Sequence, residues 1–240
     1  MTVNENGLDL VILISGRGSN AMAIADAIDE GRLAGSLKVR AVIADCSTEQ
    51  PAAGVAAAAR RGLDTAIVDP KQHADKASFE AALQCVIDSF EAHLVVLAGF
   101  MRVLSADFVE HYAGRIINIH PSLLPKYRGL NTHQRALDAD DAQHGASVHW
   151  VTPELDAGPV LTQASIDILA SDNATTLAER LLPVEHRLYP ATLALLSNLG
   201  VLSGHERNDQ TIPDGWLLDR DFDAAGRCLS RRGSGPATSS

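Results

Sequence analysis

An asparagine and a histidine stand at the end of an apolar stretch, in the segment Asn118-Ile119-His120-Pro121. Because neighbouring side chains of a strand point to opposite faces, Asn118 and His120 would share one side. A neutral amide beside an imidazole can stabilise an oxyanion while the imidazole moves a proton. Taken alone, the segment favours a simpler interpretation, a capping asparagine and a surface histidine.

A carboxylate that would complete this chemistry is present in the loop ELDAGP at residues 154–159. A carboxylate such as Asp156 stabilises the imidazolium form of a histidine beside it. Aspartate and glycine are also common in ordinary turns, so the loop has a purely structural explanation as well. Asp156 follows His120 by 36 residues, a separation that neither requires nor forbids contact.

A glycine-rich turn, GRGSNA at residues 16–21, separates an apolar run from a helical stretch. Glycines before a helix let backbone N–H groups approach an anion, and the helix dipole adds to the attraction. The turn also fits the loose dinucleotide pattern GxGxxA, with Asp45 at the end of the second predicted strand. The pattern indicates phosphate more clearly than a dinucleotide. A tight turn with Ser19 or Asn20 as the N-cap is the structural alternative.

The histidines and cysteines lack the spacing of a metal site. Among nine histidines, His144 and His149 are five residues apart, and the HExxH, CxxC and facial-triad patterns are absent. The three cysteines, an odd number, also argue against a disulfide framework. We therefore expect no catalytic metal.

These side chains must be positioned by elements that alternate regularly in the first half of the chain. Short apolar runs predict strands at 8–14, 39–45, 64–69, 94–99 and 115–120, and amphipathic stretches predict helices at 19–30, 51–61, 75–90 and 106–112. We place Pro51 in the first turn of its helix, with Gly31 and Gly62 just past two helix ends. This alternation predicts an α/β fold with a mostly parallel sheet flanked by helices. Ligands of such sheets bind beyond the carboxyl ends of the strands.

The second half of the chain has a different pattern. It predicts an irregular segment at 121–131, a helix at 132–139, strands at 146–152 and 159–168, and a long helix at 174–199. From about residue 221 the sequence loses periodicity and becomes rich in glycine, serine and proline, so we expect a flexible tail there. The prediction is one domain over 1–220, followed by a tail over 221–240.

The composition excludes several classes of protein. The chain has 240 residues, 46% of them hydrophobic, and a formal net charge of −10. That charge argues against nucleic-acid binding and requires any anionic ligand to be held by local groups. No apolar run approaches the roughly 18 residues of a membrane span, and the N-terminus lacks the basic region of a secretory signal. We expect a cytoplasmic protein that binds neither nucleic acid nor membranes.

Taken together, several segments closely resemble the phosphoribosylglycinamide formyltransferases, a family of folate-dependent enzymes of purine synthesis. The matching segments lie between residues 8 and 189 and read LISGRGSN, VVLAGFMRVLS, HYAGRIINIHPSLLPKYRGL, HGASVHWVTPELDAGPV and EHRLYP. The resemblance implies a single-domain, Rossmann-like formyltransferase fold with a folate cleft in its C-terminal part. It also implies 10-formyltetrahydrofolate as the formyl-donor cosubstrate, and glycinamide ribonucleotide as the acceptor.

The resemblance assigns roles to individual residues. It implies that His120 transfers the proton, that Asn118 stabilises the oxyanion and that Asp156 tunes His120. The residues implied for the ribonucleotide are Gly18, Ser19, Asn20 and Glu185. Those implied for folate are Lys76, Met101, Arg102, Val103, Leu104, Asn118, Thr152, Pro153, Glu154, Leu155 and Asp156. The partners are then small molecules, and the chain is a monomer or a homodimer.

Other functions remain to be compared. Formyltetrahydrofolate hydrolase and methionyl-tRNA formyltransferase share the Asn/His/Asp core. Each carries an additional domain for which we expect no room here, and the tRNA enzyme needs a basic surface. A nicotinamide-dependent dehydrogenase would use GRGSNA with Asp45, but it leaves NIHPSLLP and ELDAGP unexplained. A folate- or nucleotide-binding protein without catalysis would keep the fold, yet all three expected catalytic residue types are present.

Overall fold

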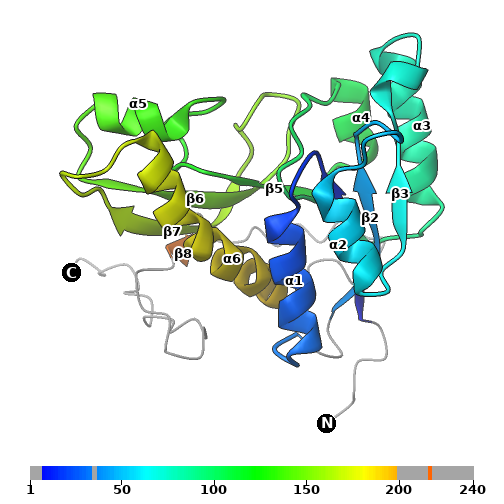
Figure 1. Ribbon diagram of the computed structural model, residues 1–240, viewed down its shortest axis with the longest axis horizontal. Helices are drawn as coiled ribbons and strands as arrows, with labels where there is room; N and C mark the ends of the chain where they lie inside the picture. Colours follow the sequence, from blue (N-terminus) through cyan, green and yellow to red (C-terminus); the bar gives the residue numbers. More distant parts are fainter. Residues whose placement is uncertain (1–6, 34–36, 199–215, 218–240) are drawn as a thin grey trace, which may run out of the picture.

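An eight-stranded sheet with helices on both faces organises the molecule (Figure 1). The computed structural model describes residues 7–33, 37–198 and 216–217 of the 240. Its strands are β1 (Leu8–Ile14), β2 (Leu37–Ala44), β3 (Thr65–Ile67), β4 (Leu94–Leu97), β5 (Ile116–His120), β6 (Gln143–Trp150), β7 (Val160–Asp167) and β8 (Trp216–Leu217). Its helices are α1 (Ser19–Asp29), α2 (Ala53–Arg60), α3 (Lys76–Asp88), α4 (Ala106–His111), α5 (Thr132–Asp138) and α6 (Ala174–Asn198), with a 3₁₀ turn η1 (Pro70–Gln72).

The strand order β3-β2-β1-β4-β5-β6-β7-β8 confirms the predicted α/β class and the mostly parallel sheet. The strands from β3 to β5 are parallel, β6 is antiparallel to both of its neighbours, and β8 is parallel to β7. The chain runs outward from β1 to β3 and then returns to place β4 on the other side of β1. In open α/β sheets such a reversal marks a crevice at the carboxyl ends of the strands, here β1 and β4, where ligands bind.

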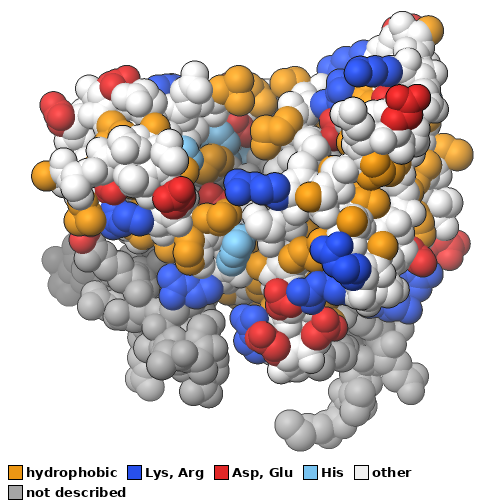
Figure 2. Space-filling model, viewed as in Figure 1, with side chains coloured by type: hydrophobic (Ala, Val, Ile, Leu, Met, Phe, Trp, Pro, Cys, Tyr) orange, Lys and Arg blue, Asp and Glu red, His pale blue; other side chains and the backbone are white. Residues whose placement is uncertain are grey.

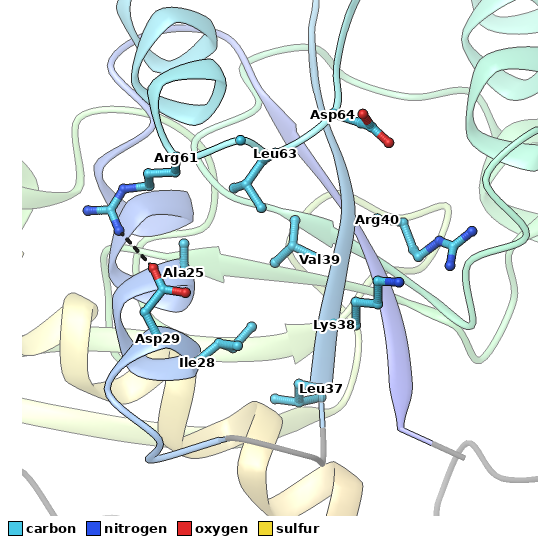
Figure 3. A pocket seen from close by; sticks show the side chains of 11 residues that line it. Ala25, Ile28, Asp29, Leu37, Lys38, Val39, Arg40, Arg61, Leu63 and Asp64 are labelled. Carbon is cyan, nitrogen blue, oxygen red and sulfur yellow. Dashed lines mark hydrogen bonds and ion pairs between the residues drawn. The ribbon is translucent and has the colours of Figure 1, made fainter. Parts of the chain in front are cut away.

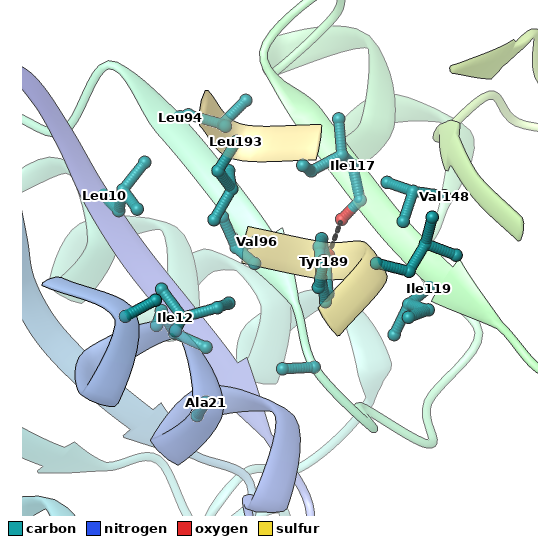
Figure 4. Packing of buried hydrophobic residues seen from close by; sticks show 14 of the residues in the cluster. Leu10, Ile12, Ala21, Leu94, Val96, Ile117, Ile119, Val148, Tyr189 and Leu193 are labelled. Carbon is teal, nitrogen blue, oxygen red and sulfur yellow. Dashed lines mark hydrogen bonds between the residues drawn. The ribbon is translucent and has the colours of Figure 1, made fainter. Parts of the chain in front are cut away.

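Alternating side chains of the central strands fill two cores. From β1, Leu10 and Ile12 face the layer of α1 and α6, whereas Val11 and Leu13 face the layer of α3 and α4. Because both faces are covered, the strand is apolar at nearly every position, as its sequence LDLVILI indicates. Figure 4 shows the first core, with Tyr189 of α6 packed among the side chains of β1, β4 and β5.

Several predicted boundaries were wrong. Pro51 precedes α2 instead of lying in its first turn, because Ala52 has a non-helical ψ of 141° and donates its N–H to the sulfur of Cys46. Strands β2 and β6 begin two and three residues earlier than predicted, at Leu37 and Gln143, where ladder pairing continues past the apolar run. The short elements η1 and β8 were not predicted. The proposed tail, 221–240, lies outside the described residues.

Two predicted helix ends were correct. Gly31 and Gly62 follow α1 and α2 with φ of 77° and 73°, a conformation that glycine adopts without strain. The long C-terminal helix is also present, as α6. No helix in the described part of the chain is long and apolar enough to cross a membrane.

Candidate functional site

Three groups of predicted site residues lie at the carboxyl ends of parallel strands: residues 18–20 follow β1, residues 101–104 follow β4, and Asn118 and His120 are in the last three residues of β5. The loop between β6 and β7 leaves β6 beside the amino end of β5, because the two strands are antiparallel, and folds back so that Asp156 reaches His120. In the space-filling view, histidine side chains lie in a hollow between the part of the molecule that carries α5 and the part that carries α2 and α3 (Figure 2). The fold therefore gathers segments that are far apart in the sequence.

His120 and Asp156, separated by 36 residues, are brought together. The Nδ1 atom of His120 lies 3.4 Å from Asp156 Oδ2, and the two side chains are only 8% and 9% exposed. On the other side of the ring, Nε2 lies 2.9 Å from the carbonyl oxygen of Tyr127. Since a carbonyl only accepts, Nε2 carries the proton of this hydrogen bond. Both ring nitrogens thus face acceptors, which an imidazolium with its two N–H donors satisfies.

The loop formed by residues 154–159 depends on a close approach between two segments of its backbone. Asp156 has a φ of 48°, and its Oδ2 atom accepts the N–H of Gly129 at 2.9 Å. A Cβ atom at Gly158 would lie 1.8 Å from the carbonyl oxygen of Trp150, so only glycine fits there. The glycine that looked like ordinary turn chemistry therefore lets the loop fold tightly enough to direct Asp156 toward His120.

A histidine that sequence reasoning missed orients Asn118. His149 lies directly opposite Asn118 in the β5–β6 ladder, and its Nε2 atom is 3.3 Å from Asn118 Nδ2. Its Nδ1 atom lies 2.8 Å from the carbonyl oxygen of Trp150, to which it donates, so Nε2 is free to accept from the amide. Burial lowers the pKa of His149, which keeps this ring neutral. Asn118 and His149 are brought together by the register of β5 and β6, which cannot be read from the sequence.

The glycine-rich turn has the geometry expected of an anion site. Gly18 is the N-cap of α1 with a φ of 65°, no side chain caps the helix, and its first turn contains no acidic residue. The alternative in which Ser19 or Asn20 caps the helix is therefore wrong. The turn is also buttressed by α2, since the N–H of Gly54 donates to the carbonyl oxygen of Gly16 at 3.1 Å. The backbone N–H groups at the start of α1 are left for a ligand.

Glu185 of α6 joins this turn through Asn20. The amide nitrogen Nδ2 of Asn20 donates to Glu185 Oε2 at 2.8 Å. Burial raises the pKa of Glu185, and the hydrogen bond from Asn20 opposes the rise. The Oδ1 atom of Asn20 is buried without a hydrogen-bond partner among the described residues. Two of the residues expected at the ribonucleotide are thus in direct contact, with one polar atom still to be satisfied.

The segment after β4 forms an apolar wall. The N–H of Met101 donates to Ser15 Oγ at 2.8 Å, which ties the start of the segment to the end of β1. Met101 and Val103 are 71% and 61% exposed, whereas Leu104 is buried. Exposed apolar side chains beside a polar crevice are what an aromatic ligand would cover.

Arg102 is exposed, but two contacts hold its side chain in place. Its Nε atom lies 2.7 Å from Asp45 Oδ2, and its guanidinium lies 5.2 Å from the centre of the Phe79 ring. The Asp45 side chain is only 4% exposed. A dehydrogenase would need this carboxylate for ribose hydroxyls, but here Arg102 takes its Oδ2 atom, and Oδ1 is buried with no hydrogen-bond partner among the described residues.

The remaining residues expected at folate lie in the loop after β6 and at the start of α3, and most of them are exposed. Glu154 pairs with Arg128 at 2.8 Å, and the hydroxyl of Thr152 donates to the carbonyl oxygen of Glu154 at 3.2 Å. Leu155 is exposed. Lys76 begins α3, half exposed, with its Nζ atom 3.7 Å from Glu80 Oε1. Glu80 also accepts the N–H of Ser105, so Lys76 stands beside the end of the apolar wall and apart from His120.

A separate cavity of about 410 Å³ lies at the other end of the strands. Leu37, Val39 and Leu63 line its apolar floor, and Arg61 of the α2–β3 connection reaches Asp29 of α1 across its rim (Figure 3). This cavity includes none of the predicted site residues. Among the described residues, no group of three or more His, Cys, Asp or Glu side chains is arranged to hold a metal ion.

Comparisons with known proteins identify relatives of this chain. A family model described as formyl transferase matches residues 8–193. The chain is 43% identical to the phosphoribosylglycinamide formyltransferase of Escherichia coli (strain K12) over 217 residues, 88% of this chain and 100% of that protein. It is 36% identical to the human trifunctional purine biosynthetic protein adenosine-3 over 79% of this chain and 18% of that protein. A solved phosphoribosylglycinamide formyltransferase from Coxiella burnetii aligns with a TM-score of 0.75 and 45% identity, over 80% of this chain and 88% of that one.

Proposed function

Because the chain belongs to the formyl transferase family, we propose that it moves the formyl group of 10-formyltetrahydrofolate to the amine of glycinamide ribonucleotide in purine biosynthesis. The products are formylglycinamide ribonucleotide and tetrahydrofolate. The observation that carries the proposal is the buried contact between His120 and Asp156, beside Asn118 and next to the uncapped start of α1. A proton donor, an amide and an anion site are what this transfer requires.

The ribonucleotide binds with its phosphate on the backbone N–H groups of Gly18, Ser19 and Asn20. This assignment is supported by the uncapped N-terminus of α1, whose dipole attracts an anion despite the chain's net charge of −10. Glu185 contacts the same substrate, which is supported by its hydrogen bond with Asn20.

The folate donor binds between the wall formed by residues 101–104 and the loop formed by residues 152–156. The exposure of Met101, Val103 and Leu155 supports this assignment, because these side chains offer apolar area to a flat ring. Lys76, exposed at the rim, meets the negatively charged end of the donor. The cosubstrate supplies the formyl group, and the proposed reaction uses no metal.

The reaction proceeds by direct attack. The amine of the ribonucleotide forms a bond to the formyl carbon, and negative charge grows on the formyl oxygen. The Asn118 amide and the protonated His120 stabilise this charge. The carbon–nitrogen bond to the folate then breaks, and the departing nitrogen takes a proton from His120. The attacking amine gives one of its own protons to the neutral imidazole left behind, which restores the imidazolium. Asp156 keeps the imidazolium stable until the proton leaves.

The Tyr127 carbonyl fits this sequence of events. Since Nδ1 of His120 faces Asp156, the N–H that Tyr127 accepts is the one to be redirected to the substrate. The carbonyl thus holds the ring in the orientation that the substrate later uses. We also propose that the enzyme works in the cytoplasm as a monomer or homodimer on small molecules alone.

The test measures deformylation of a 10-formyl folate by absorbance, with and without glycinamide ribonucleotide. We expect release only when both substrates are present. His120→Ala should lower kcat by about 10²–10⁴-fold at saturating substrates, the usual range for loss of a general acid. His93→Ala is the matched control, because His93 is exposed and only accepts the N–H of Asp9 at the start of β1.

Three outcomes would contradict parts of this proposal. Release without the ribonucleotide would identify a hydrolase, in which water replaces the amine. No release by folded protein would point to another acceptor or to a binding protein. Near-normal turnover by His120→Ala at saturating substrates would remove His120 from the mechanism while leaving the reaction intact.

A further inference from the structure

The turn that carries the Tyr127 carbonyl leaves β5 at His120 and returns to it. The N–H of Ser122 donates to the carbonyl oxygen of His120 at 2.9 Å. Within the turn, the N–H of Lys126 donates to the carbonyl oxygen of Leu123 at 3.0 Å, and the Ser122 hydroxyl donates to the carbonyl oxygen of Lys126 at 2.6 Å. The turn is therefore closed on itself before Tyr127 meets the His120 ring.

Two side chains from the neighbouring strands fasten this turn to the sheet. Gln163 of β7 donates from Nε2 to the carbonyl oxygen of Leu124 and to Ser147 Oγ, both at 2.8 Å. Ser147 of β6 donates to the carbonyl oxygen of Ser122 at 2.6 Å and accepts the N–H of Leu124 at 3.0 Å. Three backbone groups of the turn are thus satisfied by one amide and one hydroxyl.

His120, Ser147 and Gln163 form a row across the sheet. His120 pairs with Ser147 in the β5–β6 ladder, and Ser147 pairs with Gln163 in the β6–β7 ladder. Ser147 is fully buried and Leu124 nearly so, which shields these hydrogen bonds from water. Because Gln163 supplies two N–H donors at once, it fixes both the turn and the serine that also holds the turn.

The turn helps to position both partners of the His120 ring, the Tyr127 carbonyl and Asp156. Tyr127 at its end accepts from His120 Nε2, and Gly129, two residues later, donates to Asp156 Oδ2. Displacing residues 122–127 would therefore disturb the acceptor on one side of the imidazole and the carboxylate on the other. Productive proton transfer tolerates little misplacement of this kind.

We propose that Gln163 is a positioning residue for His120, acting through Ser147 and the turn formed by residues 122–127. This proposal rests on the proposed function, since it concerns the proton transfer assigned to His120. Gln163 itself touches no substrate in this scheme. It determines how the imidazole is aimed rather than how tightly the substrates bind.

The test compares Gln163→Leu with wild type in the formyl-transfer assay. Leucine has a similar size and no donors, so the carbonyl oxygen of Leu124 and the Ser147 hydroxyl lose their shared partner. We expect kcat to fall about tenfold while KM for each substrate stays within about twofold. Gln143→Leu is the matched control, because Gln143 makes a similar cross-strand hydrogen bond to Asp167 at the exposed far end of the same strand pair. It should retain wild-type kcat.

A double-mutant cycle separates positioning from a general loss of structure. In a His120→Ala background, Gln163→Leu should change the residual rate by less than about twofold, because its effect passes through the missing ring. Gln163→Glu, which keeps the size but loses the donors, should behave as Gln163→Leu does and provides a second variant if the leucine variant fails to fold.

The outcomes distinguish this inference from the proposed function. Wild-type kcat in folded Gln163→Leu or Gln163→Glu would overturn the positioning role while leaving His120 in place. An equal fall in both backgrounds would also overturn it, since the glutamine would then act on the fold in general. If His120→Ala keeps full turnover, it is the assignment of His120 that fails.

Discussion

Two imidazoles near one carboxylate have different properties because their hydrogen-bond partners differ. His149 donates from Nδ1 to the Trp150 carbonyl and presents its other nitrogen to the Asn118 amide, and burial lowers its pKa. His120 has an acceptor on each side, Tyr127 and Asp156. Asp156 is 3.7 Å from His149 and 3.4 Å from His120. Residue type alone therefore does not assign a role, since one ring orients an amide and the other is arranged to hold a proton.

Glu185 offers a prediction about pH at the same scale. Burial raises its pKa above the ordinary 4.5, so the folded chain holds this proton more strongly than the unfolded chain. The stability of the wild type therefore falls as pH rises through the raised pKa. Glu185→Gln keeps the acceptor for Asn20 and has no charge to bury. We expect it to raise the melting temperature at pH 8 by about 2–4 °C, with a smaller gain at pH 4.5.

The same substitution should impair the enzyme. A neutral amide is a weaker acceptor for a substrate hydroxyl or amine, so we expect KM for the ribonucleotide to rise about tenfold, while KM for folate stays unchanged. Thermal melts at the two pH values and steady-state kinetics measure both effects. A stability gain that is equal at both pH values would show that folding does not raise the pKa of Glu185.

The sequence pointed to candidate site residues more readily than to the residues that hold them. His120, Asn118 and Asp156 were candidates by residue type, their roles came from the resemblance, and the structure brings His120 and Asp156 into contact. His149 was passed over as one of several scattered histidines, although it lies opposite Asn118. The contribution of Gln163 depends on a row across three strands, and that of Tyr127 on its backbone carbonyl. Neither the register of paired strands nor a contact made by a backbone carbonyl can be recognised from residue type.

Among the elements, hydrophobic pattern predicted where strands and helices occur but not where each one ends. The buried strands β1 and β4 were unmistakable because both of their faces are covered by helices. Strand β6 begins at the exposed Gln143, before its apolar residues, since pairing with Asp167 extends it. The N-terminus of α2 likewise depends on a contact between Ala52 and Cys46 that no local preference contains.

One glycine links two of these elements at the anion site. Gly54 lies in the first turn of α2, and a Cβ there would come within 3.0 Å of the Gly16 carbonyl oxygen and 3.1 Å of the Arg17 carbonyl oxygen. Helix propensity favours alanine over glycine by about 1 kcal/mol, but the rigid backbone of the turn has no room for the methyl group. We expect Gly54→Ala to displace the turn and to raise KM for the ribonucleotide about tenfold, with KM for folate within about twofold.

A change on the opposite face of the same helix provides the control. Ala56 is exposed, so Ala56→Gly weakens α2 by about 1 kcal/mol through propensity alone. Isothermal titration with the ribonucleotide and steady-state kinetics would compare the two variants. If Ala56→Gly weakens ribonucleotide binding as much as Gly54→Ala, then helix stability and not the position of the turn controls the anion site.

For the molecule as a whole, strand order decides where the site lies. Reversal of the chain direction between β3 and β4 brings the turn after β1 beside the wall after β4. The 154–159 loop starts from the other end of β5, where β6 ends, and folds back until Asp156 meets His120. The net charge of −10 opposes anionic substrates at long range. Attraction must therefore come from the local groups at this edge, above all the N-terminus of α1.

This arrangement also predicts which part of the chain the reaction needs. Every residue assigned to substrate binding or proton transfer lies between Gly18 and Glu185, and α6 ends at Asn198. A chain ending at residue 220 still contains Trp216 and Leu217, the two residues of β8 that pair with the edge of β7. We propose that residues 1–220 form the catalytic domain.

The shortened chain should keep kcat and both KM values within about twofold, with a melting temperature within about 2 °C of the full chain. A matched comparison of the full chain, the chain ending at 220 and one ending at 212, which removes β8, would locate any loss. A fall in activity already at 220 would assign the last twenty residues a part in the enzyme and would contradict the proposed domain boundary.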